Sequence, residues 1–173
     1  MKIRMKRGVT IDVQHEETLR AITAVPSNSN AKNAPFPTFY QALPFAAALG
    51  WKIKREISNG SRKNMDQVKA AFFDNDSTLN GRNIALMISL LKHKDYDSIL
   101  DSSPDKDDYV EDFISFANAG LEKIQSWIDK SPDRENIADA IINGLREIDA
   151  LPKTPKQKNA ESDTISDDDF FES

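Results

Sequence analysis

Two stretches of apolar residues at helical spacing constrain this fold more than any other feature of the chain. Each stretch follows a Ser-Pro-Asp tripeptide, at Ser103-Pro104-Asp105-Lys106 and at Ser131-Pro132-Asp133-Arg134. A serine N-cap followed by a proline in the first helical position is typical of a helix start. The sequence therefore predicts two amphipathic helices. Their apolar positions are Val110, Phe113, Ile114, Ala117, Leu121, Ile124 and Ile128 in the first, and Ile137, Ile141, Leu145 and Ile148 in the second.

Residues 82–92 (RNIALMISLLK) are apolar on nearly all sides, which is typical of a helix buried at the centre of a domain. We expect the two amphipathic helices to pack on it. The predicted fold is mainly α-helical with a short N-terminal β element, an α+β arrangement. One domain would span residues 1–151, and residues 152–173 would form a disordered acidic tail because they are too polar to bury a core.

The N-terminal region begins with a strand pattern. Apolar and basic side chains alternate over residues 2–11, with Ile3 and Met5 on one face. From about Asp12 the apolar spacing becomes helical, and Pro26 is expected to end that helix. Residues 26–35 (PSNSNAKNAP) predict a polar loop.

A second helix is predicted by Thr38 and Gln41, which have the spacing of a capping box. Gly50 is expected to end this helix. Pro44 lies inside it and predicts a kink, or a start nearer Leu43.

The region after Gly50 alternates again. Residues 51–57 (WKIKREI) predict a strand or an extended arm, and residues 58–64 (SNGSRKN) predict a turn. The short segment Met65–Phe73 fits a strand and a helix equally well.

Charge is divided along the chain. Residues 1–69 contain 12 Lys and Arg against 5 Asp and Glu, whereas residues 70–151 contain 8 against 17 and residues 152–173 contain 3 against 6. The formal net charge of −5 therefore conceals a basic front and an acidic back. A basic surface attracts phosphate, and an acidic one more often meets protein.

Composition excludes several classes of protein. The chain has no cysteine, which rules out disulfides and thiolate sites and fits a reducing compartment. No apolar run approaches the ~20 residues that cross a bilayer, and the basic N-terminus is not followed by the apolar region of a signal peptide. We expect a cytoplasmic protein that makes no membrane contact.

Few residues suggest chemistry. The two histidines, His15 and His93, have no partner at metal-ligand spacing and are interpreted as lone surface residues. The carboxylates between Asp105 and Asp112 are expected to point to water or to favour the positive end of a helix. The sequence therefore predicts no metal site, no cofactor and no catalytic residue. A small nuclease, built from carboxylates such as Asp105 and Asp108, remains an alternative.

Basic residues in two early segments are the best binding candidates. An alternating basic strand followed by two helices is the element order of ribbon–helix–helix DNA-binding proteins, in which a dimer builds the two-stranded ribbon. The alternative is an edge strand whose cations prevent sheet association. The predicted nucleic-acid-binding residues, which could form one surface and would then imply a possible homodimer, are Lys2, Arg4, Lys6, Arg7, Lys52, Lys54, Arg55, Arg62 and Lys63.

Aromatic residues occur in two settings. Phe36, Phe39, Tyr40, Phe45 and Trp51 could stack on bases, but their helical spacing favours a place in the core. The tail ends with Asp167, Asp168, Asp169, Phe170 and Phe171, which resemble the acidic tip of bacterial single-stranded DNA-binding proteins, although Glu172 and Ser173 follow here. These five residues are candidates for binding a partner protein, or the tail is merely solubilising.

Three passages resemble a known family. They are the basic N-terminal strand with HEETL (15–19), FPTFYQALPFAAALGWK (36–52) and FANAGLEKIQSWI (116–128). Together they resemble the small Dnd-system-associated family numbered four, over roughly residues 1–130, with FAAALG (45–50) as the most specific element. The resemblance implies a bacterial accessory protein of defence against foreign DNA, encoded beside DNA phosphorothioation and restriction genes. It transfers no catalytic residue.

The function expected from these observations is that of a non-enzymatic, DNA-associated accessory or regulatory protein of a phosphorothioation-linked restriction system. Its basic front would contact DNA with weak or no sequence specificity, and its acidic helices or tail would contact protein components of the system. The alternative is a protein–protein adaptor subunit of a larger defence complex.

Overall fold

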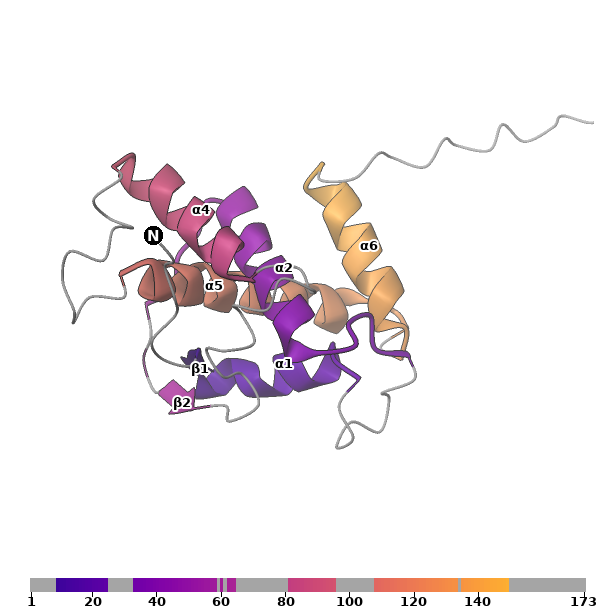
Figure 1. Cartoon of the computed structure of the whole chain (residues 1–173). Coiled ribbons are helices and arrows are strands. Elements are labelled where there is room, and N and C mark those ends of the chain that lie inside the picture. Colours follow the sequence, from indigo (N-terminus) through magenta and orange to yellow (C-terminus); the bar gives the residue numbers. More distant parts are fainter. Residues whose placement is uncertain are drawn as a thin grey trace, which may run out of the picture.

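A computed structural model describes residues 9–24, 33–58, 60, 62–64, 81–95, 108–133 and 135–149, with only the backbone at 62–64 and 108. The fold is mostly helical, as predicted (Figure 1). Its elements are β1 (Thr10–Asp12), the 3₁₀ turn η1 (Val13–His15), α1 (Glu16–Ala21), α2 (Phe39–Lys52), β2 (Arg62–Asn64), α4 (Gly81–His93), α5 (Asp108–Lys130) and α6 (Ile137–Glu147).

The central element is α5, and the prediction that residues 82–92 form the central helix is wrong. In Figure 1, α2 crosses α5, α4 lies above it, the short elements α1, β1 and β2 lie below it, and α6 packs near its C-terminal end. All seven apolar positions predicted for this helix are buried. Helix α4 instead lies at the surface and leaves Met87 and Leu91 exposed by 52% and 46%.

The closest helix contact joins α2 to α5. A Cβ atom added at Gly50 would overlap the carbonyl oxygen of Phe116, and one added at Gly120 would overlap the carbonyl oxygen of Ala46. Ala46 and Gly50 are four residues apart, as are Phe116 and Gly120, so each pair forms a small-residue stripe on one helix face. The small residues of the AAALG run therefore allow the backbones of α2 and α5 to touch.

The end of α2 differs from the prediction. Helix α2 continues through Gly50 to Lys52, so residues 51–57 are not a strand. The backbone N–H of Arg55 donates to the carbonyl of Gly50 and that of Lys54 to the carbonyl of Trp51, which is the Schellman pattern. Lys54 has the left-handed φ of 54° that usually belongs to glycine in this motif. Gly50 thus packs against α5, and the left-handed turn that ends α2 is made by Lys54 instead.

The start of α2 also differs in detail. The helix begins at Phe39, and the Thr38 side chain makes no capping hydrogen bond. Pro44 is buried inside the helix rather than at its start. The five aromatic residues predicted to belong to the core do so: Phe39 is buried, and Phe36, Tyr40, Phe45 and Trp51 pack against the core from half-buried positions.

Strands β1 and β2 form a two-stranded antiparallel sheet in which Ile11 pairs with Lys63. Residues 62–64 were predicted to lie in a turn, so that part of the prediction is wrong. The described part of the N-terminal strand thus pairs with its own chain, unlike the ribbon of a ribbon–helix–helix dimer. Asp12 joins this sheet to its surroundings, since its carboxylate accepts from the backbone N–H groups of Gln14 (3.1 Å) and Gly60 (3.1 Å).

Helix α1 ends at Ala21, several residues before the predicted stop at Pro26. The Thr23 hydroxyl donates to the carbonyl of Leu19 at 2.7 Å. The backbone N–H of Ala24 donates to the carbonyl of Phe36, and the N–H of Phe36 donates to the carbonyl of Ile22. The backbone leaves the helix because it pairs with residue 36, not because of the proline.

The predicted start of α6 at the second Ser-Pro-Asp tripeptide is wrong. Asn136, not Ser131, is its N-cap, and its side-chain oxygen accepts from the backbone N–H of Asp139 at 3.3 Å. Ser131 and Asp133 instead shape the turn after α5, where the Ser131 hydroxyl donates to the carbonyl of Asp133. Helix α6 packs on α5 and not on α4, contrary to the prediction.

Several predictions fall outside the described residues: the strand segment 2–8, most of the loop 26–35, the segment 65–73, the Ser-Pro-Asp start at 103 and the tail 152–173. Within the described ranges, no helix has both the length and the apolar character required to span a bilayer.

A candidate binding cleft between α2, α4 and α5

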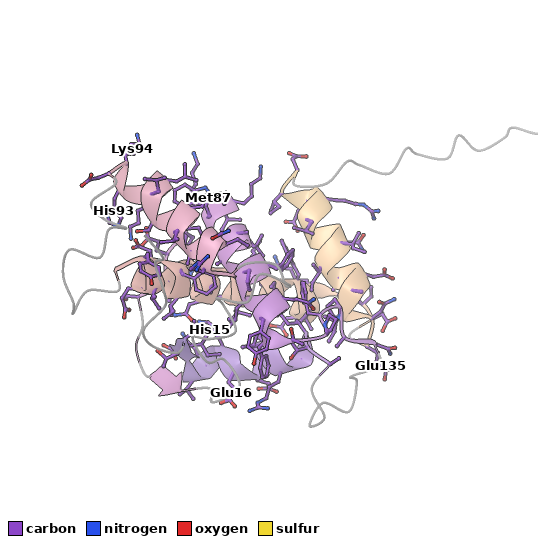
Figure 2. The ribbon with its side chains drawn as sticks, in the orientation of Figure 1. His15, Glu16, Met87, His93, Lys94 and Glu135 are labelled. Atoms are coloured by element: carbon purple, nitrogen blue, oxygen red, sulfur yellow. The ribbon has the colours of Figure 1, made fainter. Side chains whose placement is uncertain are left out.

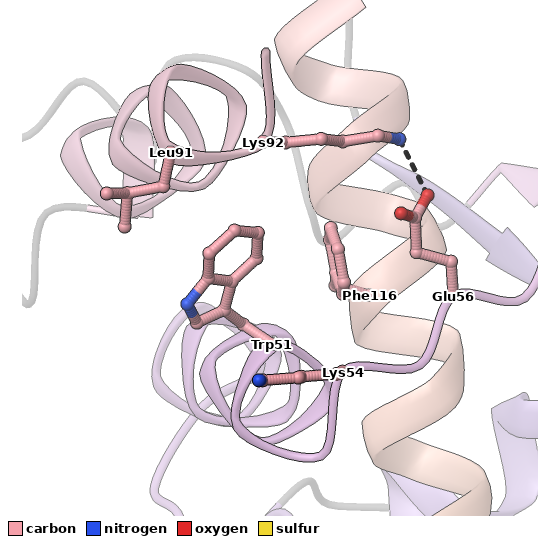
Figure 3. Close-up of a pocket in the computed structure, with 6 residues that line it drawn as sticks. All are labelled: Trp51, Lys54, Glu56, Leu91, Lys92 and Phe116. Atoms are coloured by element: carbon pink, nitrogen blue, oxygen red, sulfur yellow. Dashed lines mark hydrogen bonds and ion pairs between the residues drawn. The ribbon is translucent and has the colours of Figure 1, made fainter. Parts of the chain in front are cut away.

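A cleft of about 310 Å³ lies where the C-terminal ends of α2 and α4 meet the middle of α5 (Figure 3). Its lining combines three apolar side chains, Trp51, Leu91 and Phe116, with three charged ones, Lys54, Glu56 and Lys92. The indole of Trp51 meets the ring of Phe116 edge to face, with centroids 5.2 Å apart. The cleft therefore has an aromatic floor and a charged rim.

Lys92 bridges two carboxylates beside this floor. Its Nζ lies 2.6 Å from Oε2 of Glu56 and 2.8 Å from Oδ1 of Asp112, and it lies 5.8 Å from the centroid of the Phe116 ring. Burial alone would lower the pKa of Lys92, but the hydrogen bonds and charges of the two carboxylates outweigh it and raise the pKa above its usual value. Lys92 is therefore a fixed cation at neutral pH.

Asp112 is the buried centre of this network. Besides Lys92, it accepts from the hydroxyl of Ser89 at 2.9 Å and lies 2.8 Å from Nε2 of His93. Its side chain is only 8% exposed. Most carboxylates near the start of α5 were predicted to face water or to favour the positive helix end, but Asp112 is buried, because the ammonium of Lys92, the ring of His93 and the hydroxyl of Ser89 satisfy it. His93 is likewise a partner of Asp112 rather than a lone surface residue.

The prediction of a lone surface residue is also wrong for His15, which lies below α5. The residue is buried, and the side-chain amide of Gln14 lies 3.2 Å from its Nε2. Burial lowers the pKa of His15, although the charges of Asp12 and Glu122 act in the opposite direction. Figure 2 shows His15 inside the molecule and His93 at the outer end of α4.

Lysines lie at the C-terminal ends of the two helices that border the cleft. Neither α2 nor α4 contains an acidic residue. Helix α2 ends in Lys52 and turns at Lys54, whereas α4 carries Lys92 in its last turn and is followed by Lys94, which also has a left-handed φ, of 56°. Lysines at these positions favour the negative ends of the helix dipoles, and Lys54 and Lys92 line the cleft itself.

The structure brings only some of the predicted basic residues together. Lys52 and Lys54 are exposed, and neither has an ion pair with another described residue; Lys54 lines the cleft, whereas Lys52 does not. Arg55 is also exposed but pairs with Glu122 on α5 at 2.8 Å. The backbones of Arg62 and Lys63 lie in β2, on the other side of α5 (Figure 1).

The remaining predicted site residues, Lys2, Arg4, Lys6 and Arg7 and the tail residues 167–171, lie outside the described ranges. Over the described part of the chain, no group of three His, Asp or Glu side chains could hold a metal ion.

Leu91 and Lys92 line the cleft but were not predicted as site residues, because α4 was assigned to the acidic back of the chain and to the centre of the core. One signal was present: residues 81–93 contain three basic side chains, counting His93, and no acidic one. Trp51 was assigned to the core, and its half-buried ring in fact serves both the core and the cleft.

Comparison with known proteins agrees with the resemblance noted above. The family described as DNA sulphur modification system-associated protein 4 matches residues 10–161. The chain belongs to this family. The match starts after the basic N-terminal segment and extends beyond residue 130, so it includes α6 as well as the cleft. No curated protein and no solved structure matches the chain. Family membership associates the protein with a DNA sulphur modification system.

Proposed function

We propose that this protein is a non-enzymatic, DNA-associated accessory factor of a DNA sulphur modification system, and that the cationic rim of the cleft contacts DNA. The observation that carries the proposal is that lysines from the ends of two helices, Lys54 after α2 and Lys92 on α4, line one cleft beside the half-buried indole of Trp51. Lys52 and Lys94, at the ends of the same helices, are exposed, and α2 and α4 add no acidic residue of their own.

Such an arrangement suits nucleic acid for two physical reasons. Lysine side chains bind phosphate oxygens as point charges, which gives affinity without sequence specificity. An indole beside them offers a stacking surface for an unpaired base, a contact worth about 1–3 kcal/mol per base. The predicted contacts of Lys2, Arg4, Lys6 and Arg7 would add to this rim.

Salt dependence of DNA binding tests the proposal. Fluorescence anisotropy with labelled duplex and single-stranded DNA should show an affinity that falls steeply with salt. In the variant Lys54→Ala/Lys94→Ala the slope of log K against log salt should decrease by about 1.8 for duplex DNA, since each phosphate contact contributes about 0.9.

The matched control is Lys123→Ala/Lys130→Ala, which removes the same charge from the C-terminal half of α5. This variant should keep the slope of the unmodified protein. An unmodified protein without salt-sensitive affinity for either form of DNA would refute the proposal.

A protein–protein adaptor is the second candidate, and the exposed apolar pair on α4 favours it. Met87 and Leu91 are four residues apart and half exposed, and Figure 2 shows Met87 on the outer side of the helix. Exposed apolar side chains that adjoin one another often mark a contact with another protein. Under this candidate, Met87→Asp should abolish co-purification with the other proteins of the system and leave DNA binding intact, whereas the DNA proposal predicts no such loss.

A further inference from the structure

The cleft between α2, α4 and α5 suits a ligand that is both apolar and negatively charged. Its apolar lining consists of Leu91, the half-buried Trp51 and the buried ring of Phe116, which favours an aromatic or aliphatic group. Its rim carries Lys54, which has no ion pair with another described residue, whereas Glu56 and Asp112 are already paired with Lys92. A suitable occupant is therefore an apolar side chain that is directly flanked by negative charge.

The chain contains such a segment at its own end. Asp167, Asp168 and Asp169 directly precede Phe170 and Phe171. No other place in the chain joins three consecutive acids to two aromatic residues. The segment also lies outside the family match, which ends at residue 161.

We propose that the C-terminal segment Asp167–Phe171 docks into this cleft of the same molecule. One phenylalanine ring packs on Trp51 and Leu91, and the aspartates meet the lysines of the rim. The cleft and the segment are complementary in apolar surface and in charge. The apolar floor receives the aromatic rings, and the lysines of the rim receive the carboxylates.

Chain length permits this contact. Helix α6 is followed by Asp149, and the 20 residues from 150 to 169 span at most roughly 70 Å. A domain of ~150 residues has a radius of gyration of only about 15 Å, so the segment can reach any point on its surface. Tethering of this kind creates an effective concentration on the order of millimolar, so even a weak contact is substantially occupied.

The docked segment has a consequence that rests on the proposed function. Carboxylates on the rim would occupy the lysines that otherwise meet phosphate, so the segment would compete with DNA for the cleft. Removing the aromatic anchors should then raise DNA affinity several-fold at low salt. The docking itself does not depend on DNA and is tested without it.

Paramagnetic broadening in the full-length chain tests the docking. Because the chain has no cysteine, Ser173→Cys gives a single attachment point for a nitroxide spin label. The amide signals of Lys54 and Leu91 should broaden strongly, whereas that of Glu17 on α1, on the far side of α5, should not (Figure 1). Absence of selective broadening at the cleft would overturn the proposal.

Substitutions in the segment and in the cleft test which side chains make the contact. Phe170→Ala/Phe171→Ala and Leu91→Asp should each abolish the broadening, and Met87→Asp, which changes an equally exposed residue outside the cleft, should preserve it. Broadening that survives the phenylalanine substitutions would refute an aromatic anchor.

A mixture of isotope-labelled protein without the spin label and unlabelled protein carrying it should show no broadening. Broadening in this mixture would identify a second copy as the source of the segment and overturn docking within one chain. If the cleft signals broaden but the protein has no affinity for DNA, the docking stands and the proposed function falls.

Discussion

The middle and the C-terminal end of α5 hold their neighbouring helices in different ways. At the contact with α2, two glycines bring backbone against backbone, so that Gly50 faces the carbonyl of Phe116 and Gly120 that of Ala46. At the contact with α6, Gly144 instead faces the indole of Trp127. A backbone cannot move away locally, whereas a side chain can change its rotamer.

This difference bears on function because the cleft depends on the first contact. Trp51 and Lys54 follow Gly50 within one turn, so their position relative to Phe116 is set by the close approach of α2 and α5. Helix α6 contributes no residue to the lining of the cleft. The α2–α5 contact is thus the scaffold of the site, and the α6 contact stabilises the other end of the domain.

The largest predicted effect tests this contrast directly. Gly50→Ala should lower the free energy of unfolding by about 3 kcal/mol, because the two backbones must separate to accept the methyl group, despite the better helix propensity of alanine. Gly144→Ala should cost about 1–2 kcal/mol, since the Trp127 ring can shift. Chemical denaturation of both variants measures the difference.

Ala48→Leu is the control for Gly50→Ala, because Ala48 is an exposed residue of the same helix. It should change the free energy of unfolding by less than about 0.5 kcal/mol. Equal losses for Gly50→Ala and Gly144→Ala would show that the two contacts do not differ in rigidity.

The second prediction concerns the attachment of α4 to α5, in which the buried carboxylate of Asp112 contacts Lys92 and His93. Asp112→Asn keeps the side-chain volume but removes the charge that holds Lys92 and His93. Breaking a fully buried pair costs about 3–5 kcal/mol, and because the side chains of Lys92 and His93 are partly exposed we expect a loss of about 2 kcal/mol in the free energy of unfolding.

Glu122→Gln provides the matched control for Asp112→Asn. Glu122 lies on α5, as Asp112 does, and forms an exposed ion pair with Arg55. Removing its carboxylate charge should cost about 0.5 kcal/mol. If both substitutions in α5 cost the same, α4 is held by its apolar contacts alone and the charge network adds nothing.

The smallest predicted effect is a pH dependence from the region below α5. Burial lowers the pKa of His15 in the folded protein, so the unfolded chain binds a proton more readily. The stability contribution of neutral His15 is therefore complete above the unfolded pKa of 6.5 and is lost as the pH falls below it.

Urea denaturation between pH 7.5 and pH 5.5 measures this dependence. His15→Gln should flatten the slope of stability against pH, whereas His93→Gln, which changes the exposed histidine on α4, serves as the matched comparison. A slope unchanged by His15→Gln would show that His15 does not titrate differently on folding.

Local patterns predicted the helices well and their roles less well. The seven apolar positions of α5 and the core aromatic residues of α2 follow from periodicity alone. Gly50 was misinterpreted as a helix stop, because a glycine that permits close packing and a glycine that ends a helix look identical in sequence. The Schellman turn at Lys54 carries no glycine and so left no signal.

Burial of charged groups was equally hidden. Asp112 is one of several carboxylates near the start of α5, and nothing local distinguishes it from its neighbours. Its burial depends on Ser89, Lys92 and His93, which lie about 20 residues away on another helix. His15 is similar, since its surroundings include Glu122, more than 100 residues distant along the chain.

The sequence by itself determined the helical class of this protein, the buried face of its longest helix and its family, because these follow from residue order and periodicity over short ranges. Only the tertiary structure decided that Lys92 of α4, which belongs to the acidic half of the chain, lines the same cleft as Lys54, which follows α2. The physical reason is that glycine contacts and a buried carboxylate fix the two helices on α5, and both depend on residues far apart in the sequence.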